Sequence, residues 1–135
     1  MQTAPTYSDV VQDIAEFLSQ RLADVSAVGI DLDRVIIDPG FGFGKTAEQN
    51  FELLARLPEL QGIGQPVLVG LSRKSMISSV LDRLPEQRMV ASVALALMAV
   101  ERGARIVRVH DVAATFDALS MWQTTRQMLS QSQHS

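Results

Sequence analysis

Apolar residues recur every three or four positions near the start of the chain, from Val10 to Val25. This spacing places them on one face of a helix. Thr6 or Ser8 is the predicted N-cap, and Gly29 lies just beyond the predicted end. The chain is therefore expected to open with an amphipathic helix that buries one side.

Three short runs rich in β-branched residues alternate with further helical patterns. The predicted strands are 35–37, 66–71 and 105–109, and the further predicted helices are 51–57, 76–84, 86–102 and 113–129. Strands that alternate with helices predict a parallel sheet. The polar residues 130–135 are expected to fray. The pattern thus predicts an α/β fold in which one helix precedes three βα units with parallel strands.

The length of the chain limits how much of a larger fold it can contain. Its 135 residues fit one domain, 1–135, with one core. A closed barrel of eight βα units needs about 250 residues. The sequence therefore predicts either a small open α/β domain or about half of a barrel.

Composition narrows the possible functions. Acidic residues outnumber basic ones by 15 to 12, which argues against a nucleic-acid partner. The absence of cysteine excludes disulfides, thiolate nucleophiles and Cys-ligated metal centres. The N-terminus lacks the basic start and apolar run of a signal peptide, and the apolar stretch Val90–Val100 is too short to span a bilayer. We expect a cytoplasmic protein without a membrane partner.

Chemically active residues follow each predicted strand. Asp38 follows the first, residues 72–75 (SRKS) follow the second, and Arg108, His110 and Asp111 end the third. Ligands of parallel α/β sheets bind beyond these strand ends. Because Asp38 follows an apolar strand, we expect its carboxylate to be partly desolvated and to accept hydrogen bonds from a ligand. The alternative is that Asp38 only shapes a turn before proline.

Two cationic pairs predict anion binding at these ends. Arg73 and Lys74 stand at a predicted helix start, where an anion is favoured; a helix cap by the preceding serine is the alternative. Arg108 and His110 alternate along their strand and share one face, which suits a two-point grip on an anion. The alternative for Arg108 is a buried ion pair with one of the strand-end aspartates.

The loop 40–46 (GFGFGKT) matches a nucleotide-binding P-loop only at its end. That pattern requires glycine where Pro39 stands, and proline has no N–H to offer a phosphate. A fragment of a P-loop nucleoside triphosphatase is therefore a minor hypothesis, which ATP binding would support. Phe41 or Phe43 is expected to wall a flat ligand; the alternative is a flexible loop whose glycines only supply turns.

Three segments, IIDPGFGFGKT, PVLVGLSRKSMI and RIVRVHDV, resemble signature segments of the dihydropteroate synthase family, in order and at suitable spacing. The resemblance runs to about Gln127 and covers the C-terminal half of the family pattern. It implies part of a (β/α)₈ TIM barrel, with about three C-terminal βα units preceded by a helix. The implied activity is that of a folate-biosynthesis transferase and sulfonamide target. This enzyme joins p-aminobenzoate to 6-hydroxymethyl-7,8-dihydropterin pyrophosphate, giving 7,8-dihydropteroate and pyrophosphate.

The resemblance also implies roles for single residues. Asp38 would hydrogen-bond the amino and ring N–H edge of the pterin. Lys74 would contact the pterin and help to form the aminobenzoate site, where Ser75 would bind the carboxylate and Phe43 would pack on the ring. The pair Arg108 and His110 would hold the pyrophosphate. With Lys74, that pair forms the implied catalytic set.

Other parts of the family pattern have no counterpart in this sequence. They include the N-terminal strand with its Asn for pyrophosphate and Mg²⁺, so the family's Mg²⁺ contact would lie in the missing half. The resemblance therefore implies a truncated chain that is weakly active or inactive alone, and a homodimer. The alternative from a different class is a non-catalytic α/β module that self-associates and buries its open sheet edge.

Overall fold

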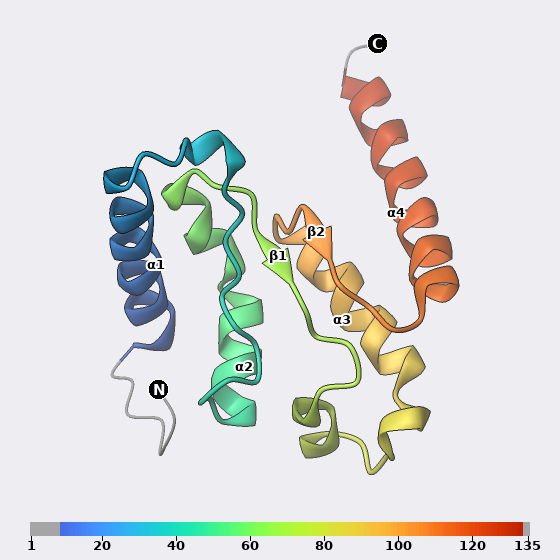
Figure 1. Ribbon diagram of the computed structural model, residues 1–135. Helices are drawn as coiled ribbons and strands as arrows, with labels where there is room; N and C mark the ends of the chain where they lie inside the picture. Colours follow the sequence, from blue (N-terminus) through green and yellow to red (C-terminus); the bar gives the residue numbers. More distant parts are fainter. Residues whose placement is uncertain (1–8, 134–135) are drawn as a thin grey trace.

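A computed structural model describes residues 9–133 of the chain (Figure 1). The α-helices and strands are α1 (Val10–Ala27), α2 (Ala47–Ala55), β1 (Leu68–Val69), α3 (Met89–Glu101), β2 (Ile106–Val107) and α4 (Val112–Gln133). Short 3₁₀ helices cover Leu32–Arg34, Leu57–Ile63, Ser75–Ser79 and Pro85–Gln87. This helix-rich order with a small parallel sheet agrees with the predicted α/β fold.

The sheet is parallel, as predicted, but its strands are shorter than the sequence indicates. In β1 and β2, Leu68 lies opposite Ile106. The first predicted strand, 35–37, contributes a single parallel bridge between Ile37 and Val67. Ile37 donates its N–H to the Pro66 carbonyl at 3.0 Å. Three extended segments therefore lie side by side in chain order, with their carboxyl ends at the same edge.

The described residues cover only one face of this sheet. Successive side chains of a strand point to opposite faces. On one face Ile37, Val67 and Val69 are at most 4% exposed and belong to the core, together with residues of α1, α2 and α3. On the other face Ile36 is 48% and Ile106 38% exposed. Parallel sheets normally bury both faces, so the second face lacks a covering layer within residues 9–133.

The first helix begins at an N-cap that the sequence reasoning missed. Asp9 accepts hydrogen bonds from the N–H groups of Val11 and Gln12, both at 3.1 Å. The N-cap prediction was therefore wrong, and the proposed residues Thr6 and Ser8 lie outside the described part. A carboxylate cap is a favourable choice because it also complements the positive end of the helix dipole.

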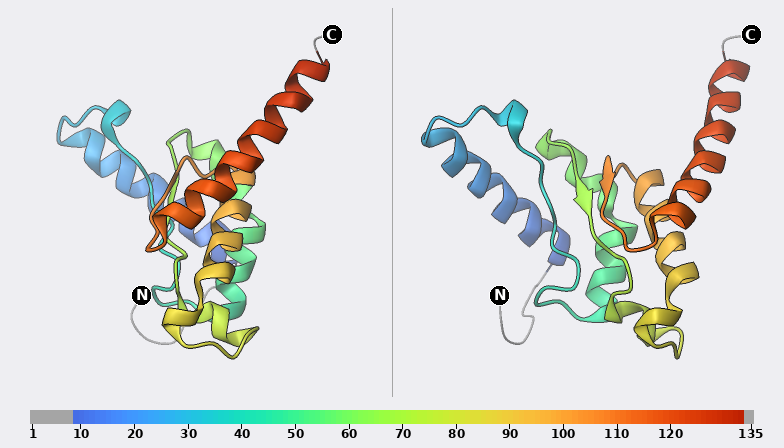
Figure 2. Two further views of the ribbon diagram at one scale, coloured as in Figure 1. Left: turned by 90° about the vertical axis from the view of Figure 1, so that its right-hand side faces the viewer. Right: turned by 45° about the vertical axis from the view of Figure 1, so that its right-hand side comes forward.

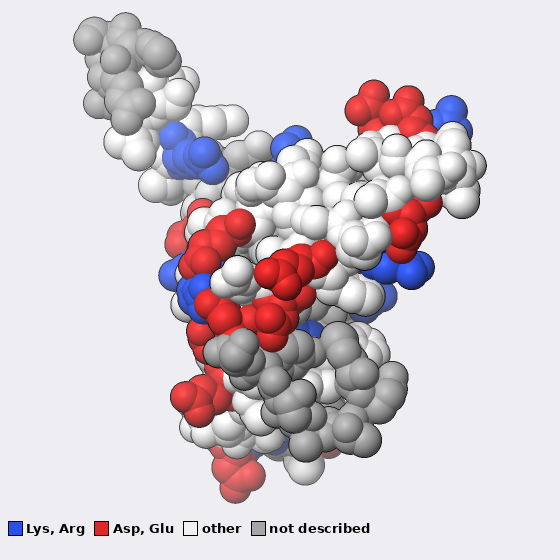
Figure 3. Space-filling model, turned by 90° about the vertical axis from the view of Figure 1, so that its left-hand side faces the viewer, with Lys and Arg blue, Asp and Glu red and all other residues white. Residues whose placement is uncertain are grey.

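An ion cluster ties α1 to the end of α2. Arg56 lies 3.1 Å from Asp9, 2.7 Å from Glu52 and 2.8 Å from Glu59. Its hydrogen bonds lower the pKa of both Asp9 and Glu59. These two carboxylates therefore stabilise the fold above their ordinary pKa, and the contribution is lost as pH falls through the lowered values. Figure 3 shows acidic side chains gathered on the α1 side of the molecule.

The segment after β1 departs most from the predicted helices. The predicted helix 76–84 is wrong: a 3₁₀ helix, Ser75–Ser79, stands there. The hydroxyls of Ser78 and Ser79 donate to the Ser75 and Met76 carbonyls at 2.6 and 2.7 Å, and such bonds compete with α-helical ones. The helix expected at 86–102 begins only at Met89, after a second 3₁₀ turn.

The last helix packs on α3 with its first half and then leaves the body of the molecule (Figure 2). It continues through Gln133, and the last two residues lie outside the described part, so the fraying expected for 130–135 stays a prediction. Met121, Met128 and Leu129 are more than half exposed on it. Within the described residues, no helix has the length and apolar character needed to cross a membrane.

Candidate functional site

Arg108 reaches from the last strand across its neighbour. Its N–H donates to the Val69 carbonyl at 3.0 Å, which continues the ladder one residue past β2. Its guanidinium lies over Gly70, where an added Cβ would stand only 3.1 Å from Nη2. Gly70 thus leaves the space through which Arg108 approaches the other strand ends. The sequence predicted only that Gly70 lies near the end of the strand 66–71.

Asp38 lies at the end of the first extended segment and starts the glycine loop. Its Oδ1 accepts the Gly40 N–H at 2.8 Å, so the turn-forming role is observed. The predicted partial desolvation is wrong, because Asp38 is exposed on the uncovered side of the sheet. Gly40, Gly42 and Gly44 have φ of +77°, +88° and +65°, a region that favours glycine and lets the loop fold back on itself.

The two aromatic residues of this loop have opposite environments. Phe41 is 1% exposed and part of the core, whereas Phe43 is 63% exposed. Buried Asn50 fixes the loop: its Oδ1 accepts the Gly42 N–H at 2.8 Å, and its Nδ2 donates to the Thr46 carbonyl at 3.0 Å. Of the two rings expected to wall a ligand, only Phe43 is available for that role.

Both lysines of the chain lie at this loop. Lys74 Nζ donates to the Phe41 carbonyl at 2.7 Å and lies 4.9 Å from the Phe43 ring centroid, a cation–π distance. Lys45 Nζ donates to the Gly40 and Phe43 carbonyls at 2.6 and 3.1 Å. Lys45 is therefore held by the loop itself.

The pKa values of the two lysines depend on charged groups at other strand ends. Burial lowers the pKa of Lys45, and Lys74 lowers it further, while Asp38 opposes the change. Burial also lowers the pKa of Lys74, with Arg108 as the second cause and Asp38 again opposing it. Four charged groups from three strand ends thus act on one another.

These couplings predict opposite responses to two substitutions. Arg108→Gln removes a neighbouring cation, so the Lys74 pKa is expected to rise while the Lys45 pKa stays unchanged. Asp38→Asn removes the opposing anion, so both values are expected to fall. Reductive methylation with ¹³C-formaldehyde followed by an NMR pH titration resolves the two side chains. A parallel shift of both lysines in Arg108→Gln would contradict the described arrangement.

The turns after β1 and β2 are joined by side chains. Ser72 Oγ lies 2.7 Å from His110 Nδ1, so Ser72 does not act as the helix cap considered above. Arg73 pairs with Asp111 at 2.9 Å, and Arg108 forms a pair with neither strand-end aspartate. The alternative of an ion-paired Arg108 is therefore wrong, and Arg108 is exposed.

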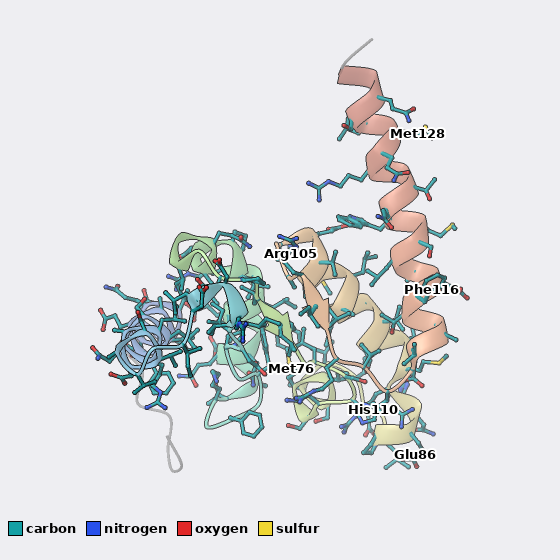
Figure 4. The ribbon with its side chains drawn as sticks, turned by 45° about the horizontal axis from the view of Figure 1, so that its top comes forward. Met76, Glu86, Arg105, His110, Phe116 and Met128 are labelled. Atoms are coloured by element: carbon teal, nitrogen blue, oxygen red, sulfur yellow. The ribbon has the colours of Figure 1, made fainter. Side chains whose placement is uncertain are left out.

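The structure brings together most of the predicted site residues. Asp38, Phe43, Lys74 and Arg108 form the connected group, and His110 lies two residues beyond Arg108 with its ring against Ser72. Ser75 follows Lys74 directly and is exposed at the start of its 3₁₀ helix. Figure 4 shows His110 and Arg105 at opposite ends of β2. Sequence reasoning did not predict the roles that the structure gives to Lys45, Asn50, Gly70, Ser72 and the Arg73–Asp111 pair.

One large hollow of the described residues lies away from the strand ends. About 780 Å³ opens at the opposite end of β2, between the end of α3 and residues such as Trp122 and Arg126 of α4. The strand ends border a hollow of about 150 Å³ lined by residues including Asp38, Phe43 and Phe17 of α1. We place the site at the strand ends because Lys45, Lys74 and Arg108 act there on one another and on Asp38, which also lines the smaller hollow.

Comparisons with known proteins decide the family. The family described as pterin binding enzyme matches residues 1–110. The chain belongs to this family. It is 53% identical over 125 residues to the dihydropteroate synthase of Haemophilus influenzae, and this match covers 93% of the chain and 46% of that protein. The Escherichia coli dihydropteroate synthase is 42% identical over 125 residues, covering 93% of the chain and 44% of that protein.

Solved structures of pterin-binding enzymes agree with the fold. Dihydropteroate synthase of Xanthomonas albilineans with 4-aminobenzoic acid matches with TM-score 0.89 and 53% identity, covering 91% of this chain and 45% of that chain. The Yersinia pestis enzyme in complex with a sulfonamide drug matches with TM-score 0.91 and 43% identity, covering 94% and 46%. The resemblance seen in the three sequence segments is confirmed. The chain spans about half the length of the relatives it matches.

Proposed function

We propose that this chain carries the dihydropteroate synthase function of its family. It would contribute about three C-terminal βα units of a (β/α)₈ barrel, preceded by a helix. The observation that carries the proposal is the meeting of Asp38, Lys74 and Arg108 at the carboxyl ends of three parallel segments, the place where α/β barrels bind substrates. The uncovered sheet face would then be the barrel interior.

The loop and the turn after β1 suit a flat heterocycle and an aromatic acid. The Asp38 carboxylate would accept hydrogen bonds from the pterin amino and ring N–H groups while its Oδ1 holds Gly40. The exposed Phe43 ring would pack on p-aminobenzoate, with Lys74 between the aminobenzoate and pterin sites. Ser75 would bind the aminobenzoate carboxylate through its exposed hydroxyl.

The strand-end cations suit the leaving group. The amine of p-aminobenzoate attacks the methylene carbon of the pterin pyrophosphate, so a C–N bond forms as the C–O bond to pyrophosphate breaks. Negative charge grows on the departing pyrophosphate, which Arg108 and His110 would stabilise with Lys74 nearby. No covalent enzyme intermediate is required, and the amine proton leaves to solvent.

Mg²⁺ is the metal ion that the family resemblance implies. Among the residues that the structure describes, no group of three or more His, Cys, Asp or Glu side chains can hold a metal ion. Asp111 is occupied by Arg73. The described residues therefore form no Mg²⁺ cage of their own. We propose that any Mg²⁺ contact comes from the other half of the family pattern.

Dihydropteroate formation and ligand binding by the purified chain test this function. We expect weak turnover or none with dihydropterin pyrophosphate, p-aminobenzoate and MgCl₂. Binding of dihydropterin pyrophosphate, followed by calorimetry, is expected to be lost in Asp38→Ala and Lys74→Ala. The exposed Arg83, placed between Ser75–Ser79 and Pro85–Gln87, provides the matched control Arg83→Ala. Equal binding by all variants would overturn the proposal.

A second candidate is self-association without catalysis, because Ile36 and Ile106 remain exposed on the uncovered sheet face. We propose that the chain forms a homodimer in either case, in the cytoplasm and without nucleic-acid or membrane partners. Sedimentation velocity separates the candidates. Tight self-association that Asp38→Ala and Lys74→Ala leave unchanged, without pterin binding, would favour the second.

A further inference from the structure

Side-chain contacts continue the register of the sheet beyond its last hydrogen-bonded residues. Ser72 meets His110, and Arg73 meets Asp111. Both pairs are separated by 38 positions, as are Leu68 and Ile106 in the ladder. The two turns therefore stay aligned through side chains where backbone pairing has ended.

The contacts of Ser72 with His110 favour one direction for the hydrogen bond between the two side chains. Ser72 is 8% exposed, and its Oγ accepts the His110 backbone N–H at 3.1 Å. The same Oγ lies 2.7 Å from Nδ1 of that ring. A serine hydroxyl has one hydrogen, and among the described residues Nδ1 is the only acceptor that this hydrogen reaches. We infer that the hydroxyl donates to Nδ1, an arrangement that places the ring proton on Nε2.

The opposite edge of the ring is the one that a ligand can reach. His110 is exposed, whereas Ser72 is buried, so Nε2 lies on the accessible side. Arg108 precedes His110 by two residues, and the two side chains lie against Gly70 and Ser72, which are also two residues apart. A neutral imidazole in this tautomer presents an N–H donor beside a guanidinium, an arrangement that fits an oxyanion.

We propose that Ser72 is a positioning residue for His110: it fixes the ring so that Nε2–H donates to an anion held jointly with Arg108. The proposal rests on the proposed function, in which that anion is pyrophosphate. Ser72 itself touches no substrate. Its effect passes through the orientation and tautomer of the imidazole.

The turn that carries Ser72 is braced from the other side. Arg73 has φ of +57°, the only positive value at a non-glycine residue in the described part. Its N–H donates to the hydroxyl of Ser92 at 2.8 Å, and Arg88 donates to its carbonyl at 2.9 Å. These bonds, with the Asp111 pair, hold the unusual backbone in place. Ser72 is therefore kept at a fixed distance from the ring.

The first test measures the tautomer directly. The sequence has two histidines, so a His134→Gln background leaves His110 as the only imidazole. Long-range ¹H–¹⁵N spectra of the ¹⁵N-histidine-labelled chain at about pH 8, above the ordinary imidazole pKa, distinguish protonated from unprotonated ring nitrogens. We expect a proton on Nε2 alone. A proton on Nδ1 in the parent chain would overturn the inference without any variant at Ser72.

The second test removes the hydroxyl. In Ser72→Ala we expect the Nδ1–H form to become detectable and the pyrophosphate Kd to rise about tenfold, whereas Ser72→Thr retains the parent tautomer. Ser120→Ala is the matched control, because that hydroxyl donates only to the Phe116 carbonyl in α4. Unchanged ring signals together with unchanged pyrophosphate affinity in a folded Ser72→Ala chain would overturn the inference.

A third variant separates this inference from the proposed function. His110→Gln is expected to weaken pyrophosphate binding. If it does not, the pyrophosphate role of the site is wrong, although the tautomer measurement still reports on Ser72.

Discussion

Replacing Arg108 with alanine is expected to weaken pyrophosphate binding by roughly 10- to 100-fold. The guanidinium is a planar fork of donors that matches phosphate oxygens, and it lies exposed over Gly70 at the strand ends. Hydrogen bonds to charged groups contribute about 1.5–3 kcal/mol, which corresponds to the stated range in affinity. Isothermal titration of the chain with pyrophosphate measures the effect.

The same strand provides a control for this substitution. Arg105 is also exposed, but it lies at the opposite end of β2 (Figure 4), so Arg105→Ala removes an equal charge far from the site. We expect Arg105→Ala to bind nearly as the parent does. Arg108→Lys, which keeps the charge and loses the fork, is expected to fall between the two. Equal losses at 105 and 108 would show that only net charge matters.

Replacing Phe41 with alanine is expected to lower the free energy of unfolding by about 3–5 kcal/mol, the range for large aromatic side chains in a core. Phe41 is 1% exposed and anchors the glycine loop to the core. Phe43, two residues away in the same loop, is 63% exposed, and its replacement by alanine is expected to change stability by at most about 0.5 kcal/mol. Urea unfolding followed by circular dichroism measures both.

The substitutions at Phe41 and Phe43 also separate an effect on folding from an effect on ligand binding. Phe43→Ala is expected to weaken p-aminobenzoate binding while the chain remains folded, because its ring faces solvent beneath Lys74. If Phe41→Ala fails to fold, Phe41→Leu keeps apolar volume at the site and should show a smaller loss in the same direction. Similar destabilisation by Phe41→Ala and Phe43→Ala would contradict the assignment of one ring to the core.

The sequence predicts the parallel order and the meeting of charged strand ends well, because both follow from short-range patterns. Runs of β-branched residues alternate with helical periods, and Arg108 and His110 are two residues apart on one face. The same logic does not reveal which of two neighbouring residues is buried. Asp38 was expected to be desolvated and is exposed, because the sheet face it lies on has no covering layer in the described residues.

Contacts between distant turns are beyond such patterns. Nothing local to Ser72 indicates that its hydroxyl contacts a ring 38 residues later. Its position before the predicted helix 76–84 suggests a helix cap instead. The failure at 76–84 has a local cause that was visible: consecutive Ser78 and Ser79 compete for backbone carbonyls. The role of Gly70 depends on the length of Arg108, which crosses from the next strand.

Because the chain has only two lysines, proteolysis at lysine reports on one region of the molecule. A lysine-specific protease has two peptide bonds to cut in this chain, after Lys45 and after Lys74. Both side chains donate hydrogen bonds to carbonyls of the glycine loop. Limited digestion therefore reports the local opening of this loop, and protection by an added compound identifies an occupant of the strand ends without any label. The cleavage sites of an arginine-specific protease are spread over the rest of the chain, so its digestion of the same sample reports global unfolding.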